Sequence, residues 1–333
     1  MNRMVVLALL APEDEDAAPF RQEIEGDPAL AERVELRFAA REAAHEAIAD
    51  AEVVVCGLLP PDLLAAAPRL RWVSFWSAGL DTKLRPDILA RDLLITNASG
   101  VHGPNIAEHV LAFMLMFTRR MPHYQRAQIE GQWQRAPSPD FHTEMAAELT
   151  GQTLGIVGLG HIGEDLARRA KAFDMRVIAT KRDLAARHAN VAPLDALLPP
   201  ERLPQLLAES DHVCIALPYT PQTRHLFDAA MLAHMKPTAY LYNIARGKIV
   251  DEAALIAALQ AGRLAGAGLD VFETEPLPTD SPLWKMENVI VTPHVAGITP
   301  YYFPRAAALF AANLKRYLAG QPLSNLYDPQ RGY

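Results

Sequence analysis

The chain contains little cysteine and no long apolar run. Its two cysteines, Cys56 and Cys214, each lie in a short apolar stretch, so we interpret them as small buried hydrophobic residues. Two such residues make neither a disulfide framework nor a zinc set, and they fit a reducing compartment. We therefore expect a cytoplasmic protein without a metal site. Because no run approaches the roughly 20 apolar residues that a membrane span needs, we expect no transmembrane helix.

An excess of basic charge is also missing. The 333 residues carry 32 Lys and Arg against 39 Asp and Glu, so the formal net charge is -7. This balance disfavours a nucleic acid or an anionic membrane surface as the main partner, but it permits a small anionic substrate, which responds to local charge. The apolar start of the chain superficially resembles a secretion signal. Its apolar core is short and leads into an acidic stretch, so we predict a first β-strand there.

Three glycines, Gly158, Gly160 and Gly163, stand in the spacing GxGxxG between a strand-like run at 153–157 and a helical pattern at 164–173. In this setting the first glycine permits a tight turn, the second lets a pyrophosphate approach the backbone, and the third lets the helix pack close to the strand. The helix N-terminus adds free N–H groups and the positive end of its dipole. An ordinary glycine-rich turn is the alternative, but the surrounding unit favours a dinucleotide-binding site.

Strand-like apolar runs alternate with helical stretches through both halves of the chain. This alternation predicts an α/β fold with two Rossmann-like or flavodoxin-like domains, each built on a parallel sheet. A length of 333 residues fits two domains, by a prior of roughly 150 residues for each. The predicted strands cover 5–10, 34–38, 52–56, 72–75, 93–96, 153–157, 176–179, 212–217, 240–244, 265–271 and 288–291.

The predicted helices include a long apolar one at 104–121, which we expect to be buried between the domains. Pro104 suits a first helical turn, and Asn105 and Glu108 favour a helix N-terminus. Residues 122–150 contain scattered Pro, Gln and Trp, so we expect an irregular connector with a short helix. The other predicted helices cover 20–25, 42–49, 62–66, 164–173, 252–259 and 304–318.

Arg246, Glu275 and His294 each lie just past the C-terminal end of a predicted strand. In an open parallel sheet these ends face the crevice where ligands bind, so the pattern places the three side chains on the rim that holds the nucleotide. A lone histidine after a strand is more often structural, but together the three suit hydride addition to a carbonyl. Histidine supplies a proton to the oxygen, the carboxylate stabilises the imidazolium, and arginine holds a substrate carboxylate.

At these residues the chain resembles the D-isomer-specific 2-hydroxyacid dehydrogenase family. The resemblance covers nearly the whole chain beyond residue 70, and the order and spacing of its motifs are specific. The matching segments are SAGLD (77–81), GVHGPNIAEHVLAFML (100–115), GLGHIG (158–163), LPYTPQTRHLF (217–227), NIARGKIVDEAALIAAL (243–259), GAGLDVFETEPL (266–277) and SPLWKMENVIVTPHVAG (281–297).

The resemblance implies a domain arrangement and an activity. Members have a discontinuous substrate domain, here 1–102 plus 296–333, and an inserted Rossmann domain for the nucleotide, here 103–295, with a cleft between the two. They reduce 2-ketoacids to D-2-hydroxyacids with NADH or NADPH. They usually form homodimers through the nucleotide domain, and they close the cleft on binding. The final helix at 304–318 would therefore return to the first domain.

The resemblance also implies roles for individual residues. His294 is the general acid/base, Glu275 is its partner, and Arg246 orients the substrate carboxylate and polarises the carbonyl. The loop of Ser77, Ala78 and Gly79 would bind the substrate carboxylate. The residues expected at the cofactor are Gly158, Gly160, His161, Ile162, Gly163, Thr180, Lys181, Arg182, Leu217, Pro218, Thr223, Ile244, Ala245, Asp270, His294, Ala296 and Gly297.

One position departs from the pattern of NAD-preferring members, which carry an acidic residue at the end of the second nucleotide-domain strand for the ribose hydroxyls. Here that end reads Thr180, Lys181, Arg182, and the first acid is Asp183. The two cations would attract a 2′-phosphate, which a carboxylate would repel. We therefore predict a preference for NADP(H), with NAD(H) still possible. The alternative is that both cations are solvated loop residues.

Other functions remain open at this point. The formate dehydrogenases of the superfamily pair the histidine with glutamine, so Glu275 argues against that activity, whereas phosphite oxidation keeps similar residues. Corepressor-like proteins that sense nucleotides also keep the three rim residues, although the chain has no basic patch. The substrate stays undecided among glyoxylate, hydroxypyruvate, pyruvate, phenylpyruvate and branched 2-ketoacids. The aromatic residues that would wall its pocket, or belong to the core or an interface, are Phe75, Trp76, Trp284, Tyr301 and Tyr302.

Overall fold

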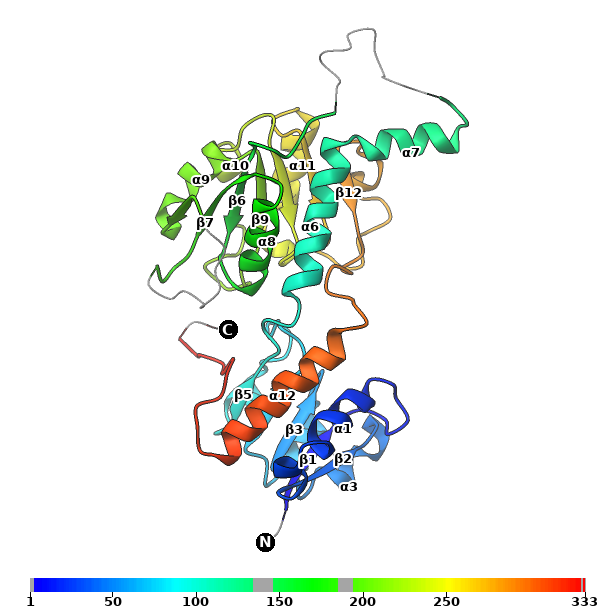
Figure 1. Ribbon diagram of the computed structural model, residues 1–333, viewed down its shortest axis with the longest axis vertical. Coiled ribbons are helices and arrows are strands. Elements are labelled where there is room, and N and C mark those ends of the chain that lie inside the picture. The colour runs from blue at the N-terminus through cyan, green and yellow to red at the C-terminus, as the bar shows by residue number, and fades with distance from the viewer. Residues whose placement is uncertain (1–2, 134–145, 185–193, 331, 333) are drawn as a thin grey trace. The chain divides into compact units, whose positions relative to one another are not determined.

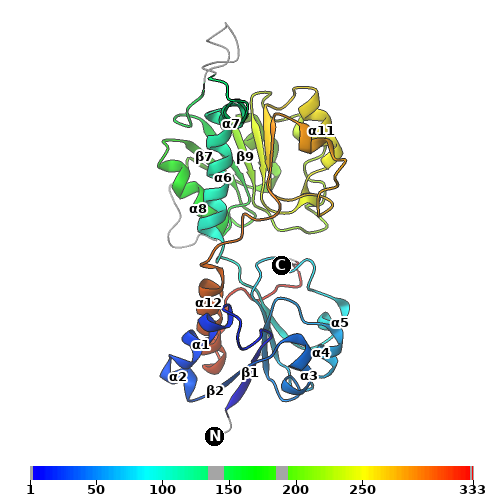
Figure 2. The same ribbon diagram turned by 90° about the vertical axis from the view of Figure 1, so that its right-hand side faces the viewer.

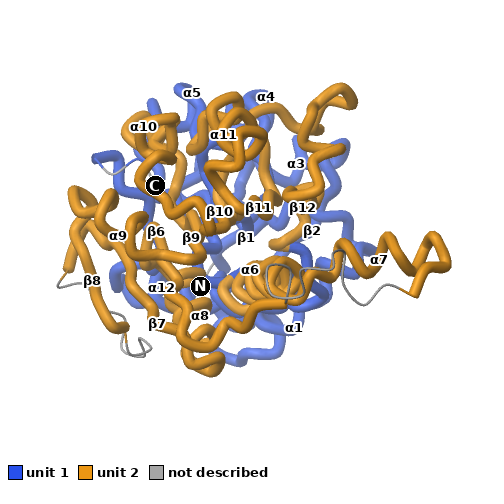
Figure 3. Tube along the Cα trace, turned by 90° about the horizontal axis from the view of Figure 1, so that it is seen from above, with its two compact units in different colours: residues 1–102, 298–333 blue, residues 103–297 orange. Residues whose placement is uncertain are grey.

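The computed structural model describes residues 3–133, 146–184, 194–330 and 332. The chain divides into two compact units, which Figure 3 shows in different colours. Unit 1 contains residues 1–102 and 298–333, and unit 2 contains residues 103–297. Each unit has its own parallel sheet with helices on both faces (Figures 1 and 2). The predicted fold class, an α/β protein with two parallel-sheet domains, is confirmed.

The sheet of unit 1 has five parallel strands in the order β2-β1-β3-β4-β5. This is the flavodoxin-like order of an open α/β sheet. All four residues of β3 and of β4 are buried, as expected for central strands that are covered on both faces. The strands are β1 (Met4–Ala8), β2 (Val34–Phe38), β3 (Val53–Cys56), β4 (Trp72–Phe75) and β5 (Leu94–Thr96).

Alternate residues of these strands serve two separate cores. Val53 and Val55 pack with helices α1, α2 and α12 on one face, whereas Val54 and Cys56 pack with α3, α4 and α5 on the other (Figure 2). Helix α12 therefore joins the N-terminal part of the chain although it lies near the C-terminus. The helices are α1 (Ala17–Glu25), α2 (Pro28–Ala31), α3 (Ala44–Ala47), α4 (Pro61–Ala65), α5 (Pro86–Leu89) and α12 (Tyr302–Leu318).

The sheet of unit 2 has seven parallel strands in the order β12-β11-β10-β9-β6-β7-β8. The order reverses between β6 and β9, and open α/β sheets bind ligands beyond the carboxyl ends of the strands at such a switch point. The strands are β6 (Thr153–Val157), β7 (Arg176–Thr180), β8 (Ala196–Leu198), β9 (His212–Ile215), β10 (Tyr240–Asn243), β11 (Gly266–Leu269) and β12 (Val289–Val291).

Helices α6 and α8 cover one face of this sheet and α11 lies on the other (Figure 2). Helix α6 approaches α8 so closely that a Cβ at Gly103 would lie 2.1 Å from the Asp165 carboxylate. The helices are α6 (Gly103–Thr118), α7 (Met121–Ile129), α8 (His161–Lys171), α9 (Leu203–Glu209), α10 (Ala229–Leu232) and α11 (Glu252–Gln260). None of the helices within the described ranges has both the length and the apolarity to cross a membrane.

Some predicted boundaries need correction. The strands predicted at 34–38, 72–75 and 153–157 have those bounds, whereas β8, α9 and α10 were not anticipated. The helix predicted at 104–121 ends at Thr118, because Arg120 has a φ of 56° and Pro122 lies in the first turn of a new helix, α7. The buried face of α6 belongs to the core of unit 2, and residues 134–145 of the predicted connector lie outside the described residues.

Candidate active site

The three glycines of the GxGxxG motif have three different surroundings. Gly158 has a φ of 102°, and a Cβ there would come within 2.8 Å of the Ala216 carbonyl oxygen. A Cβ at Gly163 would lie 2.7 Å from the Gly158 carbonyl oxygen, so this glycine permits close packing of α8. A Cβ at Gly160 would have no heavy atom within 4 Å, so the backbone is open in front of this residue. The loop thus fits a pyrophosphate at the N-terminus of α8.

The end of β7 supports this loop and also carries the two predicted cations. The Thr180 hydroxyl is buried and accepts a hydrogen bond from the Gly158 N–H at 3.2 Å, so it orients the glycine loop and does not stand open to a ligand. The Lys181 ammonium lies 3.6 Å from a carboxylate oxygen of Glu164, in the first turn of α8, with the two side chains only 14% and 12% exposed. Arg182 is exposed. The rim therefore bears a carboxylate, supplied by α8, that the strand-end pattern did not reveal.

The turn that carries Arg246 is built on a buried asparagine. Asn243, the last residue of β10, accepts from the Ala245 N–H at 3.1 Å and donates to the Arg246 carbonyl at 3.0 Å. A Cβ at Gly247 would lie 1.8 Å from the Phe272 carbonyl carbon, so this turn packs directly on the backbone that leads to Glu275. The sequence thereby brings the loops after β10 and β11 together.

Asp270, at the end of β11, organises the loop that carries His294. Its buried carboxylate accepts hydrogen bonds from the Thr292 hydroxyl at 2.6 Å, the Val295 N–H at 2.9 Å and the Ala296 N–H at 3.0 Å. Its carbonyl oxygen accepts from the His294 N–H at 2.8 Å. His294 has a φ of 56°, in the left-handed region, so the surrounding hydrogen bonds have to hold a strained backbone.

His294 and Glu275 form a direct pair on the rim. The His294 Nδ1 lies 2.7 Å from one carboxylate oxygen of Glu275, and the other oxygen accepts from the Phe272 N–H at 3.0 Å. A carboxylate can only accept, so the imidazole Nδ1 carries a hydrogen and the Nε2 atom is left to face a ligand. Both side chains are partly exposed, so the pair is accessible.

A small apolar hollow of about 400 Å³ adjoins this pair. Trp284, one of the aromatic residues whose role was undecided, lines it and donates from its indole N–H to the Pro278 carbonyl at 2.8 Å. Phe75 belongs to the core of unit 1, and the Tyr302 hydroxyl donates to the Trp76 carbonyl at 2.8 Å in the same unit. The other lining residues of the hollow are Phe272, Glu275, Pro276, Leu277, Val291, Pro293 and His294.

The remaining residues predicted at the cofactor lie in loops after strands, at the start of α8 or in the core beneath them. The Thr223 hydroxyl donates to the Pro218 carbonyl at 2.9 Å and closes the loop after β9. Ile244, Ala245 and Ala296 are buried. Leu217 is partly buried against the core, His161 and Ile162 begin α8, and Gly297 is the last residue of unit 2.

The predicted carboxylate-binding loop lies in unit 1, directly after β4. The Ala78 carbonyl accepts from the Asn97 amide at 2.9 Å, and the Ser77 carbonyl accepts from the Ala98 N–H at 3.0 Å. The Ser77 hydroxyl donates to the Gly79 carbonyl at 3.2 Å. These bonds fix the shape of the loop at the carboxyl edge of its own sheet.

Fold and rim together define the class, a Rossmann-type oxidoreductase that uses a dinucleotide. Residues 111–296 match the family described as D-isomer specific 2-hydroxyacid dehydrogenase, NAD binding domain. The chain therefore belongs to the D-isomer specific 2-hydroxyacid dehydrogenase family, and its predicted membership is confirmed.

The similar proteins include two curated reductases. A glyoxylate reductase of Korarchaeum cryptofilum is 38% identical over 293 residues, which cover 86% of this chain and 85% of that protein. A glyoxylate/hydroxypyruvate reductase B of Pectobacterium carotovorum is 38% identical over 292 residues, covering 86% and 88%. A D-isomer specific 2-hydroxyacid dehydrogenase from Xanthobacter autotrophicus, solved with NADPH and MES, is 32% identical with a TM-score of 0.78, and the match covers 100% of both chains.

Proposed function

We propose that the protein reduces a small 2-ketoacid, such as glyoxylate or hydroxypyruvate, to the D-2-hydroxyacid with NADPH as the preferred donor. The observation that carries the proposal is the His294–Glu275 pair, joined at 2.7 Å on the rim that also bears the glycine loop. The two curated relatives, named as reductases of glyoxylate or of glyoxylate and hydroxypyruvate, support the substrate class.

The nicotinamide, when bound, supplies a hydride to the carbonyl carbon of the ketoacid. His294 donates the proton from Nε2 to the carbonyl oxygen, so that the carbonyl gains two electrons and one proton in forming the alcohol. Glu275 holds the Nδ1–H of the ring and stabilises the charged imidazolium before the transfer. Arg246 stays charged throughout and holds the substrate carboxylate with its planar donors.

A panel of 2-ketoacids tests the proposal, with oxidation of NADPH followed at 340 nm and the product resolved by chiral chromatography. We expect turnover of glyoxylate or hydroxypyruvate and, for chiral products, the D-isomer. Failure to reduce any member of the panel would instead favour a protein that only binds nucleotides.

The roles of the rim residues are tested by His294→Asn and Glu275→Gln. General acid catalysis contributes about a hundredfold to ten-thousandfold, so His294→Asn should lose at least about a hundredfold in kcat. Its affinity for NADPH, measured by fluorescence, should stay within about threefold of the wild type, since the ring acts on the substrate. A His294→Asn variant with wild-type kcat would overturn the assignment.

The preference for NADPH rests on Lys181 and Arg182 at the end of β7. Lys181 directly follows β7, and the end of this second strand is where the fold places the adenosine ribose of a dinucleotide, so its ammonium would attract a 2′-phosphate there. The Xanthobacter structure that contains NADPH is consistent with this assignment. We expect a higher kcat/KM with NADPH than with NADH, and a reduced ratio in Lys181→Ala and Arg182→Ala. A higher kcat/KM with NADH in the wild type would contradict the preference.

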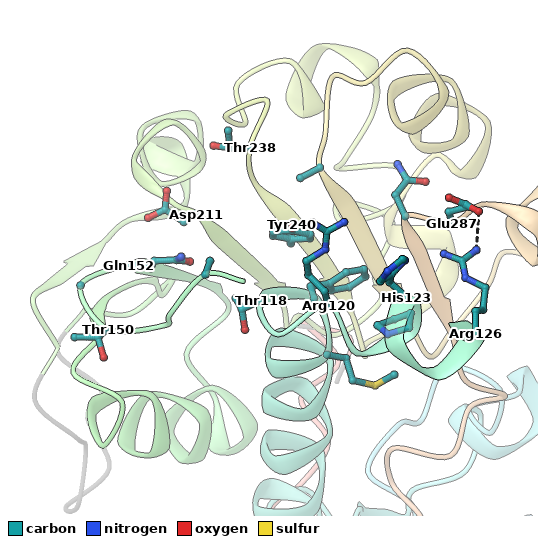
Figure 4. A pocket seen from close by; sticks show the side chains of 17 residues that line it. Thr118, Arg120, His123, Arg126, Thr150, Gln152, Asp211, Thr238, Tyr240 and Glu287 are labelled. Atoms are coloured by element: carbon teal, nitrogen blue, oxygen red, sulfur yellow. Dashed lines mark hydrogen bonds and ion pairs between the residues drawn. The ribbon is translucent and has the colours of Figure 1, made fainter. Parts of the chain in front are cut away.

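We also infer that two copies associate through unit 2. Helix α7 extends away from the rest of this unit (Figure 3), and Ile129 and Trp133 at its end are 80% and 94% exposed. At the base of α7 lies a hollow of about 900 Å³. Figure 4 shows Gln152 at one side of it and Arg126 at the other, with Tyr240 between them, and Arg126 pairs with Glu287 at 2.6 Å. Several of its lining residues directly precede or begin strands, so the hollow lies at the amino ends of the strands. The candidate active site lies at their carboxyl ends.

Light scattering of the purified protein tests this association. We expect a dimer for the wild type and a monomer for the double variant Ile129→Asp, Trp133→Ala, because the variant removes the apolar surface of the α7 segment. Leu89→Asp is the matched control, since Leu89 is 48% exposed but lies in unit 1. A monomeric wild type, or a variant that remains dimeric, would contradict the inference.

A further inference from the structure

Helix α6 supports the loop that carries His294 from behind. Asn105 and His109 lie four residues apart and therefore on one face of the helix. The Asn105 amide donates to the Ala296 carbonyl at 2.7 Å, and the His109 Nε2 lies 3.0 Å from the Thr292 hydroxyl. The helix thus holds the loop on both sides of His294.

The direction of the hydrogen bonds follows from the groups involved. The Thr292 hydroxyl has one hydrogen, and it donates this hydrogen to the Asp270 carboxylate at 2.6 Å, because a carboxylate can only accept. The hydroxyl oxygen must then accept from His109, so the His109 Nε2 carries a hydrogen. The resulting relay runs from the His109 N–H through the Thr292 O–H to Asp270.

The environment of His109 agrees with a neutral ring. Burial lowers the pKa of His109, and the nearby Asp270 carboxylate opposes this effect only in part. That carboxylate, 3.9 Å from Nε2, is the titratable group that faces the ring, and the Phe113 ring packs edge-on at 4.6 Å. A neutral ring with hydrogen on Nε2 has no proton left for Nδ1.

We propose that His109 is a positioning residue for the reduction, because its Nε2–H fixes the Thr292 hydroxyl that in turn fixes the Asp270 carboxylate. Asp270 holds the Val295 and Ala296 amides, and it accepts the His294 N–H through its carbonyl. The relay therefore maintains the left-handed backbone of His294, which is strained and persists only when its surroundings hold it. The kinetic part of this inference rests on the proposed function.

The hydrogen-bond relay can be tested by NMR, without measuring enzyme activity. In ligand-free protein labelled with ¹⁵N-histidine, we expect the His109 ring signals of the neutral form with hydrogen on Nε2, assigned by their loss in His109→Gln. The same signals should change in Thr292→Val but not in Thr292→Ser, which keeps the hydroxyl. Hydrogen on Nδ1, or signals indifferent to Thr292→Val, would overturn the relay whatever the enzyme reduces.

The effect on the reaction is tested with pairs of variants. His109→Leu and Thr292→Val should lower kcat by about tenfold to a hundredfold, because a small misplacement of a catalytic group is enough for such a loss. His109→Gln and Thr292→Ser, which keep the donor and the hydroxyl, should recover most of it. The KM for NADPH should change by less than about threefold in all four variants. His234→Leu, at an exposed histidine of the same unit, is the control and should retain wild-type kcat.

A double variant shows whether the two residues act together. If His109 and Thr292 belong to one relay, the variant that combines His109→Leu with Thr292→Val should lose no more kcat than the more impaired of the two single variants. Losses that multiply, or single variants with wild-type kcat, would refute the positioning role. If the wild type reduces no 2-ketoacid, the proposed reaction fails, and the NMR experiment still decides whether the relay exists.

Discussion

A buried histidine of unit 2 makes the stability of the protein depend on pH. His212, the first residue of β9, has no exposed surface, and its ring stacks with those of Tyr240 and Tyr242. The His212 Nε2 donates to the Gln152 amide oxygen at 2.6 Å, and its Nδ1 accepts from the Tyr242 hydroxyl at 2.8 Å. The neutral ring therefore has a hydrogen-bond partner at each nitrogen, and burial opposes the charge that a second proton would bring.

The magnitude follows from the pKa. Burial lowers the pKa of His212 to about 4, against the opposing effect of Asp211. In the unfolded chain the pKa is about 6.5, so between these values the unfolded state binds a proton that the folded state does not. Stability must then fall as pH decreases through this window, by about 2 kcal/mol between pH 7.5 and pH 5 and by about 3 kcal/mol below pH 4.

The assay is urea denaturation at pH 7.5, 6.5, 5.5 and 5.0 with fixed ionic strength, for the wild type and for His212→Gln. The variant should lose about 2 kcal/mol less than the wild type over this range, whatever its stability at pH 7.5. Carboxylates paired with a cation titrate below this range, and Glu252, whose pKa burial raises, is common to both proteins. The Lys171 ammonium, for example, lowers the pKa of Asp195, so the contribution of that pair is lost only below about pH 4.

Two results would refute this explanation. Equal losses in the wild type and in His212→Gln would assign the dependence to other groups, of which the half-buried His109 is the first candidate, since burial lowers its pKa as well. Should the variant not fold, NMR of the wild-type ring decides the question. The His212 signals should not titrate between pH 7.5 and pH 5.0, and a midpoint near 6.5 would contradict the low pKa.

Three further predictions concern the rim. Gly160→Ala should keep its Tm within about 2 °C but weaken NADPH binding by about tenfold or more in calorimetry, because the added methyl meets no protein atom and occupies the space of the pyrophosphate. Gly247→Ala should destabilise the protein to urea by about 3 kcal/mol or more, because its Cβ would overlap the Phe272 backbone. Glu164→Gln should raise the ratio of kcat/KM for NADPH over NADH by about threefold or more, because it removes the carboxylate beside Lys181, and an unchanged ratio would contradict that effect.

The fold could be predicted because central parallel strands are buried on both faces and therefore appear as continuous apolar runs. The runs at Val53–Cys56 and Thr153–Val157 show this directly. Strand β8 escaped prediction because an apolar run of only three residues, Ala196–Leu198, is too short to distinguish from a loop. The end of α6 was predicted too late, at 121 and not at Thr118, because a left-handed Arg120 has no sequence signature, unlike a glycine at the same conformation.

The positions on the rim could also be predicted, but their orientations could not. Strand-end logic placed Glu275 and His294 on the same edge, and the structure joins them at 2.7 Å. The same logic predicted that Thr180 contacts the ligand, whereas its hydroxyl accepts a hydrogen bond from the Gly158 N–H. A strand end fixes where a residue lies, and the hydrogen bonds that compete for its side chain decide what it faces.

Two of the groups that bind rim residues come from helices and not from strand ends. Glu164 of α8 reaches Lys181, and His109 of α6 reaches the loop that carries His294. In the sequence, nothing distinguishes either residue from the other polar residues of its helix, so neither is marked as part of the site. A polar side chain on the buried face of such a helix must find a partner, because an unsatisfied buried group is costly. For His109 and Glu164 these partners lie just past the carboxyl ends of strands, and through them the two helices set the charge and the geometry of the rim.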